Sequence, residues 1–247
     1  MARPHIPPSY YLRRAVACYE HAGEAHAAAE VLAEGDLPDI TEAARRFAAL
    51  GDLSSAGEAY LKAGQPRPAL DCFRRAHMVE GELRCLLALE DSAHAGALLL
   101  EMQRPAEAIP HLEQALQVLS DAVPALRAQF QLAQALVLTG QHDAASQHYR
   151  DAHPRLLKLP ATAASAPAWV ALGDWGLAAR RQDRMQEGYA EALRLLEAAD
   201  ELDRWHQVAR RYLQAARTMH NRRLVQLLET RIAAMPQPLV SRHARSG

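Results

Sequence analysis

The chain repeats its own pattern at short, regular intervals, and this repetition limits what it can fold into. In the stretch GDLSSAGEAYLKAGQPRPALDCFRRA, residues 51–76, Gly51 begins a segment that Gly64 begins again 13 residues later. The matching positions are Gly51 and Gly64, Ala56 and Ala69, Tyr60 and Phe73, and Ala63 and Ala76. A glycine, then small and aromatic residues at helical spacing, is typical of a structural unit that is copied along a chain.

Apolar residues at spacings of three and four predict amphipathic helices through most of the sequence. Turns that contain Gly, Pro or Asp interrupt this pattern every 13 to 17 residues. The pattern predicts about fourteen helices, near residues 10–22, 25–34, 40–50, 53–63, 66–76, 79–89, 92–102, 105–119, 123–139, 142–153, 168–181, 185–199, 202–218 and 221–234. Pro110 falls inside one of them, where it should kink or restart the helix.

Helices this short are marginal alone, so each must bury its apolar stripe on its neighbours in sequence. Small alanine side chains let such helices approach closely, while Tyr60 and Phe73 are expected to fill the space between the layers. We therefore expect an all-α fold, a right-handed α-solenoid of about seven antiparallel helix hairpins.

The segment LAQALVLTGQHDAASQHYRDA carries a recognisable signature at Leu132, Leu136, Gly140, Ala145, Tyr149 and Ala152. It resembles the tetratricopeptide repeat family, whose unit is a pair of helices. Partial matches are Ala44, Phe47, Gly51, Ala56, Tyr60 and Ala63; Ala95, Gly96, Leu99, Ala108, Leu112 and Ala115; and Trp169, Leu172, Gly173, Tyr189 and Ala192. The 13-residue interval is also similar to the shorter helical repeats of clathrin and coat proteins.

A proline-rich segment suggests where the array is interrupted. Residues 154–167, PRLLKLPATAASAP, carry three prolines and exceed an ordinary repeat turn. They predict either a mobile joint or a displaced short helix. The expected organisation is an extension at 1–9, repeats at 10–153, a linker at 154–167, repeats with basic capping helices at 168–235, and a tail at 236–247.

Motifs that carry chemistry are missing from the sequence. It has no Gly-rich phosphate loop, no His-Glu-x-x-His, no Cys-x-x-Cys and no Gly-x-Ser-x-Gly. Cys18, His21 and His26 fall close together, but a zinc site would need a fourth ligand. We expect no enzyme activity, no cofactor and no metal. Without an apolar run long enough to cross a membrane, or a disulfide framework, we expect a cytoplasmic protein.

The resemblance implies a binding face, because the first helix of each tetratricopeptide pair lines a concave surface. By analogy, the partner contacts are Arg13, Glu20, Thr41, Arg45, Arg127, Phe130, Gln134 and Asp174. Repeats that clamp a C-terminal carboxylate have Lys and Asn where this chain has Phe130 and Gln134. The sequence therefore argues against a carboxylate clamp.

The charge is unevenly distributed along the chain. Residues 1–203 carry 19 Lys and Arg against 28 Asp and Glu, whereas residues 204–247 carry nine Arg and one Glu. The candidate basic patch comprises Arg210, Arg211, Gln214, Arg217, Arg222 and Arg223. Such a patch could cap the array, dock on an acidic protein surface, bind a second copy head to tail, or neutralise phosphates of nucleic acid.

Taken together, these features favour a non-catalytic scaffold or adaptor that binds a protein or peptide partner in a cytosolic complex. Two alternatives stay open. The first is a nucleic-acid-binding helical repeat that uses the basic C-terminal helices. The second is an accessory or regulatory subunit of an enzyme encoded separately.

Overall fold

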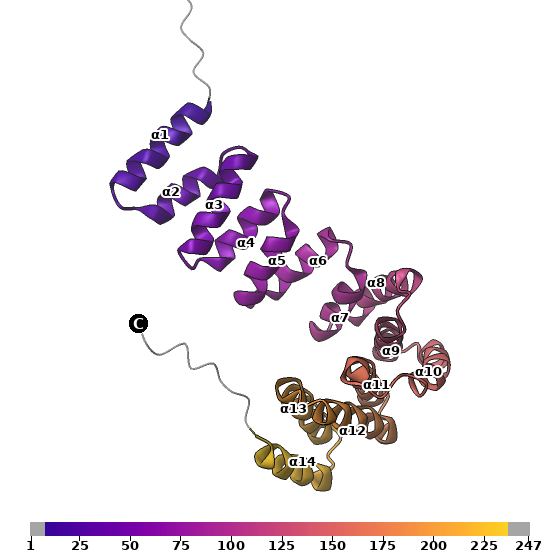
Figure 1. The fold of residues 1–247 in the computed structure, drawn as a ribbon. Helices are drawn as coiled ribbons and strands as arrows, with labels where there is room; N and C mark the ends of the chain where they lie inside the picture. The colour runs from indigo at the N-terminus through magenta and orange to yellow at the C-terminus, as the bar shows by residue number, and fades with distance from the viewer. Residues whose placement is uncertain (1–7, 237–247) are drawn as a thin grey trace, which may run out of the picture. The chain divides into compact units, whose positions relative to one another are not determined.

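The computed structural model describes residues 8–236, and these form helices and turns without a strand (Figure 1). The first helices are α1 Pro8–His21, α2 Ala25–Ala33, α3 Leu37–Ala49, α4 Leu53–Lys62, α5 Pro66–Arg75, α6 Val79–Ala88 and α7 Ser92–Glu101. They are followed by α8 Pro105–Val118, α9 Ala122–Leu138, α10 His142–Leu156, the short 3₁₀ helix η1 Ala163–Ser165, α11 Ala166–Ala178, α12 Gln182–Ala198, α13 Leu202–Thr218 and α14 Arg222–Ala234. The all-α prediction is confirmed, and within residues 8–236 the number of α-helices is the predicted fourteen.

The chain divides into two compact units, Met1–Leu98 and Leu99–Gly247, and the division falls within α7. Inside each unit, helices pack mainly on those next to them in sequence, such as α3 on α4 and α4 on α5, or α9 on α10 and α11 on α12. This local pattern of contacts is that of an α-solenoid.

The proline-rich segment at 154–167 does not separate two bodies in the second unit. Helix α10 continues through Pro154 to Leu156, and a 3₁₀ helix fills residues 163–165. Leu156, Ala163 and Trp169 lie in one hydrophobic core, so both ends of the segment are anchored in it. Helix α8 likewise runs through Pro110 without restarting. Residues 1–7 and 237–247, which include most of the predicted extension and tail, lie outside the described residues.

Many of the turns between helices share one geometry. Gly51 has φ +81° and donates its N–H to Ala48, while Asp52 donates to Phe47, the pair of bonds that forms a Schellman motif. In the turn between α5 and α6, His77 has φ 55° and forms the same motif without a glycine. The helix pattern therefore imposes this conformation even where the sequence has a bulkier residue.

In the first unit, an aromatic ring fills the gap between glycines. Phe73 is fully buried, and a methyl group on Gly57 or Gly81 would lie 2.7 Å or 2.5 Å from its ring. Ala56 and Ala69, from the duplicated segment, are also fully buried. The repeated residues therefore serve construction of the stack.

The second unit has its closest helix contact between α11 and α12. A methyl group on Gly188 would lie 2.4 Å from the backbone nitrogen of Gly173 and 2.5 Å from the carbonyl oxygen of Trp169. Tyr189 and Trp205 are fully buried beside this contact. Because α11 and α12 meet backbone to backbone, the positions of the polar side chains on α11 are tightly fixed.

Candidate functional site: a groove between α9, α11 and α13

Three helices of the second unit border a pocket of about 170 Å³. Its wall is formed mainly by α9, α11 and α13, which are the alternate helices of the stack. The lining residues are Glu101, Arg127, Gln131, Ala166, Pro167, Val170, Ala171, Asp174, Leu196, Arg204, Gln207, Val208 and Arg211. We call this surface the groove. It brings together two residues that the sequence marked as partner contacts, Arg127 and Asp174.

Asp174 is the most buried charged group in the groove. Its side chain is 11% exposed. Its Oδ1 accepts hydrogen bonds from Arg211 Nε at 2.7 Å and from the Tyr189 hydroxyl. Burial raises the pKa of the Asp174 carboxyl, while the Arg211 guanidinium acts in the opposite direction. The arginine thus holds a buried carboxylate that also orients Tyr189.

The groove has an excess of positive charge. Arg211 is bound by Asp174 and lies 4.0 Å from Glu101, and Arg204 is paired with Glu201 at 2.5 Å. Within residues 8–236, Arg127 has no hydrogen-bond or ion-pair partner of its own. Its guanidinium is therefore available for an acidic group that enters the groove.

One predicted contact in α9 is wrong. Phe130 is fully buried and packs in the same core as Leu126 and Ala133, so it cannot contact a partner. The next residue, Gln131, lines the groove instead, and Gln134 is half-buried outside its lining. The spacing Leu126, Phe130, Ala133 is itself that of a buried helix stripe, a signal in the sequence that outweighs the analogy with the family.

The predicted contacts in the first unit take part in ion pairs and hydrogen bonds within the chain. Arg13 lies 3.3 Å from Asp39, Glu20 binds Arg46 at 2.6 Å, and Arg45 lies 3.8 Å from Glu42. Thr41 accepts a hydrogen bond from Gln65 at 3.2 Å. These side chains are on accessible helix faces, but they do not line the groove.

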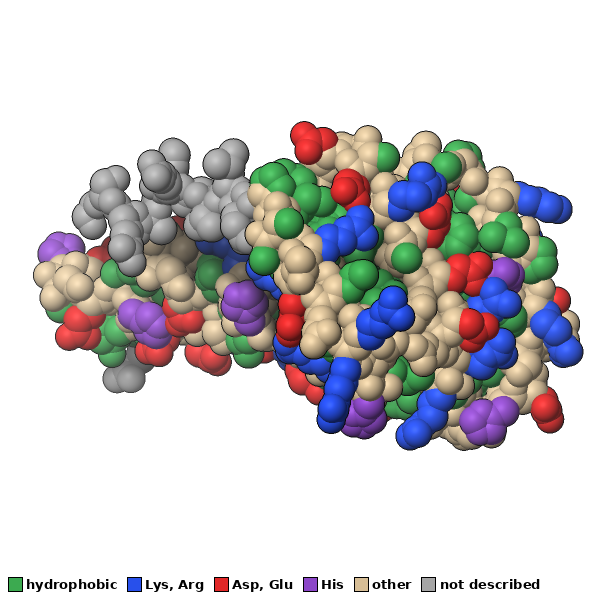
Figure 2. All heavy atoms as spheres, turned by 90° about the horizontal axis from the view of Figure 1, so that it is seen from below, with side chains coloured by type: hydrophobic (Ala, Val, Ile, Leu, Met, Phe, Trp, Pro, Cys, Tyr) green, Lys and Arg blue, Asp and Glu red, His purple; other side chains and the backbone are tan. Residues whose placement is uncertain are grey.

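The basic patch is partly neutralised within the chain. Arg211 is bound to Asp174, and Arg217 binds Glu229 at 2.7 Å. Arg210, Gln214, Arg222 and Arg223 are exposed. On the face drawn in Figure 2, basic side chains are interspersed with acidic ones and do not form one continuous field. The sequence predicts Arg211 in this patch, whereas in the structure it binds Asp174, 37 positions away. Local spacing in the sequence cannot reveal such a contact.

Among residues 8–236, no group of three or more His, Cys, Asp and Glu side chains is arranged to hold a metal ion. Over the same range, none of the helices combines the length and apolarity that crossing a bilayer requires.

The fold and the groove define this chain as a helical-repeat protein. Residues 88–158 match the tetratricopeptide repeat family, so the resemblance seen in the sequence is confirmed for that segment. A tetratricopeptide repeat protein from Parabacteroides merdae, known from a crystal structure, is similar at 14% identity and a TM-score of 0.39, over 91% of this chain and 98% of that one. No curated protein matches the sequence.

Proposed function

We propose that this protein is a non-catalytic scaffold or adaptor that binds a segment of a partner protein in the groove of its second unit. The observation that carries the proposal is the guanidinium of Arg127, which attracts the buried Asp174 but has no hydrogen-bond or ion-pair partner among residues 8–236, beside the apolar side chains of Val170 and Val208. Tetratricopeptide repeats generally mediate protein-protein interaction. A protein segment can supply both an acidic group that binds Arg127 and apolar atoms that pack on Val170 and Val208.

The size of the groove also favours a protein partner over a free small molecule. At about 170 Å³ it is smaller than the roughly 300–1,000 Å³ of most small-molecule pockets. It suits a single anchoring side chain of a longer segment. The glutamine side chains of Gln131 and Gln207 can donate and accept hydrogen bonds along that segment.

The proposal extends to location and to the first unit. A cytoplasmic location is supported by the free thiols of Cys18, Cys72 and Cys85. In the first unit, Arg45 is exposed and is a proposed additional contact. An accessory subunit of a separately encoded enzyme would use the same groove, and its partner would then be that enzyme.

The test is comparative affinity capture from the native cells, with and without nuclease and at two salt concentrations. We compare the wild type with Arg127→Glu, which reverses the groove charge. The matched control is Arg67→Glu on α5, an exposed arginine that, like Arg127, has no hydrogen-bond or ion-pair partner among residues 8–236 and does not line the groove. Proteins that survive nuclease, are lost in Arg127→Glu and are retained in the control support the proposal.

Two results would contradict it. Equal capture by the wild type and Arg127→Glu would remove the groove from consideration. Capture that collapses with nuclease, and weakens in an Arg222→Glu, Arg223→Glu double variant, would instead favour nucleic acid bound by the basic patch.

A further inference from the structure

A second and larger pocket lies on a different surface of the same unit. Its volume is about 660 Å³, and it is formed by the ends of α9 and α11, by α10, and by the turn before α12. The lining residues are Val137, Leu138, His142, Ser146, Tyr149, Arg150, Trp175, Ala178, Ala179, Arg180 and Arg181. It shares no residue with the groove, so we treat it separately as the turn pocket.

Two stacked aromatic rings form part of the wall of the turn pocket. The rings of Tyr149 and Trp175 lie 4.2 Å apart between centroids and 7° from parallel. On α11, Trp175 follows directly after Asp174, and successive helix residues point about 100° apart. Asp174 therefore faces the groove while Trp175 faces the turn pocket.

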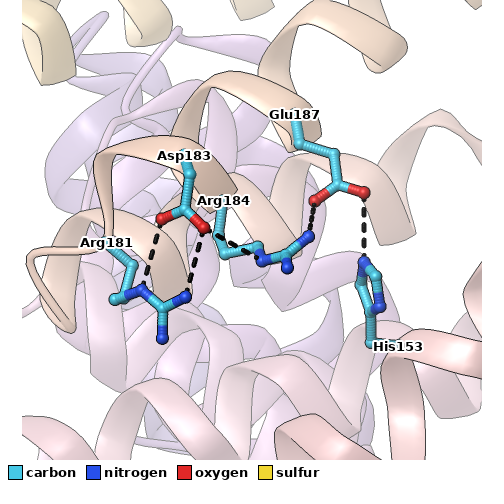
Figure 3. Close-up of polar contacts among 5 residues, drawn as sticks. All are labelled: His153, Arg181, Asp183, Arg184 and Glu187. Carbon is cyan, nitrogen blue, oxygen red and sulfur yellow. Dashed lines mark hydrogen bonds and ion pairs between the residues drawn. The ribbon is translucent and has the colours of Figure 1, made fainter.

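Figure 3 shows a ladder of charged side chains that runs from Arg181 and α12 to His153 of α10. Arg184 lies over the Tyr149 ring at 5.8 Å and binds Glu187 at 2.6 Å. Glu187 in turn binds His153 at 3.1 Å, and the His153 ring stacks on Tyr149. Burial raises the pKa of the Tyr149 hydroxyl, so this side chain stays neutral at physiological pH.

The same ladder holds Arg181, which is one of the residues that line the turn pocket. Asp183 receives two hydrogen bonds from Arg181, at 3.2 Å and 3.1 Å, and lies 3.3 Å from Arg184. Asp183 and Glu187 are therefore both engaged with cations of α12 and its preceding turn (Figure 3). Neither acid lines the turn pocket.

The lining of the turn pocket is positively charged. It includes Arg150, Arg180 and Arg181 but no Asp or Glu. Arg150 donates a hydrogen bond only to the neutral amide oxygen of Gln147, at 2.8 Å. In the part of the chain that the structure describes, Arg180 has no hydrogen-bond or ion-pair partner. Two arginines beside an aromatic and aliphatic wall thus lack an anion.

We propose that the turn pocket is a second binding site, which takes an acidic segment of a partner protein. A carboxylate or phosphate of that segment binds Arg150 and Arg180, and an adjacent apolar side chain packs on Leu138 and on Tyr149, the ring that covers Trp175. Arginine guanidinium groups form charge-assisted, often bidentate, hydrogen bonds with both of these anions. The volume of about 660 Å³ has room for several side chains.

Charge complementarity favours a short acidic protein segment over nucleic acid. A nucleic acid backbone carries regularly spaced phosphates and binds best along an extended basic track. Here the lining has only three arginines, and one of them, Arg181, is already bound by Asp183 (Figure 3). The apolar wall of Val137, Leu138 and Ala178 also has no role in binding phosphates alone.

The probe is a short end-capped peptide of glutamate and leucine, titrated into the full chain. The readout is the indole N–H signal of Trp175 in a nitrogen–proton NMR spectrum, assigned with Trp175→Phe. The sequence has only 3 Trp, and Trp205, fully buried in α13, serves as an internal reference for the fold. We expect a saturable shift of the Trp175 signal and no shift of the Trp205 signal.

Variants then connect the shift to the arginines. We expect Arg180→Ala to weaken binding about tenfold, and Arg150→Ala with Arg180→Ala to weaken it by about a hundredfold. The control Arg67→Ala removes one positive charge from an exposed position of α5 that also lacks an ion-pair partner among residues 8–236, and should change affinity less than about twofold. Arg127→Glu, in the groove, should also leave this binding unchanged, so the two proposals fail independently.

Further peptides and competitors separate the possible sources of the anion. Tighter binding when a glutamate is replaced by phosphoserine supports a phosphorylated segment, and equal or weaker binding supports a carboxylate. A glutamine and leucine peptide that binds equally well would overturn the proposal. So would competition by inorganic phosphate at the same concentration as the peptide, or tighter binding of a single-stranded oligonucleotide.

Discussion

The contact between α11 and α12 allows a sharp test of the packing argument. In Gly188→Ala, the added methyl group would lie 2.4 Å from the backbone nitrogen of Gly173 and 2.5 Å from the carbonyl oxygen of Trp169. Both neighbours are backbone atoms of α11, so no side chain can rotate away. Relief requires the two helices to separate by about 1 Å, since carbon contacts are favourable near 3.5–4.0 Å.

Two opposing effects set the magnitude. Overpacking a close contact costs about 1–3 kcal/mol, and a backbone clash belongs at the upper end of that range. Replacing glycine by alanine in a helix contributes about 1 kcal/mol of stability in return. We therefore expect Gly188→Ala to lower the free energy of unfolding of the second unit by about 2 kcal/mol.

Urea unfolding followed by tryptophan fluorescence measures this directly. Trp169, Trp175 and Trp205 all lie in the second unit, so the signal reports that unit alone. With a urea dependence of about 2 kcal/mol per M, the midpoint should fall by about 1 M.

A matched variant separates packing from helix propensity. Ala190 is on the exposed side of α12, two residues from Gly188. Ala190→Gly should lower stability by about 1 kcal/mol through propensity alone. If Gly188→Ala proves neutral or stabilising while Ala190→Gly behaves as expected, the close approach of α11 and α12 is refuted.

Three other changes have defined outcomes. Arg211→Ala leaves Asp174 buried without its cation and should destabilise by about 1–2 kcal/mol at neutral pH, because the arginine is itself partly exposed. Burial raises the pKa of Asp174, so the loss of stability in Arg211→Ala should be smallest at low pH, where the carboxyl is protonated. The loss should grow as the pH rises through the folded-state pKa of Asp174. Chemical denaturation at several pH values measures this dependence. Asp52→Ala removes the cap of α4, where Asp52 accepts the Ser55 N–H at 3.0 Å, and should cost about 1 kcal/mol by thermal unfolding monitored by circular dichroism. The Ser55 N–H lowers the pKa of Asp52, so this contribution is present above the ordinary aspartate pKa and is lost as the pH falls through the folded-state value. Phe73→Ala should cost about 3–5 kcal/mol in the same assay, and a loss below about 1 kcal/mol would contradict the role of this ring in the first unit.

Much of the architecture followed from the sequence because helix formation in this chain is local. The spacing of apolar residues predicted helices near 53–63 and 66–76, and α4 and α5 occupy Leu53–Lys62 and Pro66–Arg75. Gly51 and Gly64 come directly after the predicted helices 40–50 and 53–63, and they have φ +81° and +70° there. Each of these features depends on residues within one or two helical turns.

The packing of the proline-rich segment could not be predicted from local sequence. Three prolines predicted either a mobile joint or a displaced short helix at 154–167; Pro154 is inside α10, a 3₁₀ helix fills residues 163–165, and both ends of the segment lie in a common core. Proline disfavours a helix by about 3 kcal/mol in its interior. Packing of Leu156 and Trp169 in the tertiary structure outweighed that local cost.

The sequence by itself determined the class of fold and the approximate extent of its helices, because both depend on periodicity along the chain. Only the tertiary structure decided which polar residues meet. It placed Gln131 in the groove, and it joined Arg211 to Asp174 across 37 positions. It also stacked Tyr149 on Trp175 at the turn pocket. Each helix in the stack packs on neighbours on two sides. The distance between the packed helices, set here by Gly173 and Gly188, decides which helix faces stay exposed to solvent.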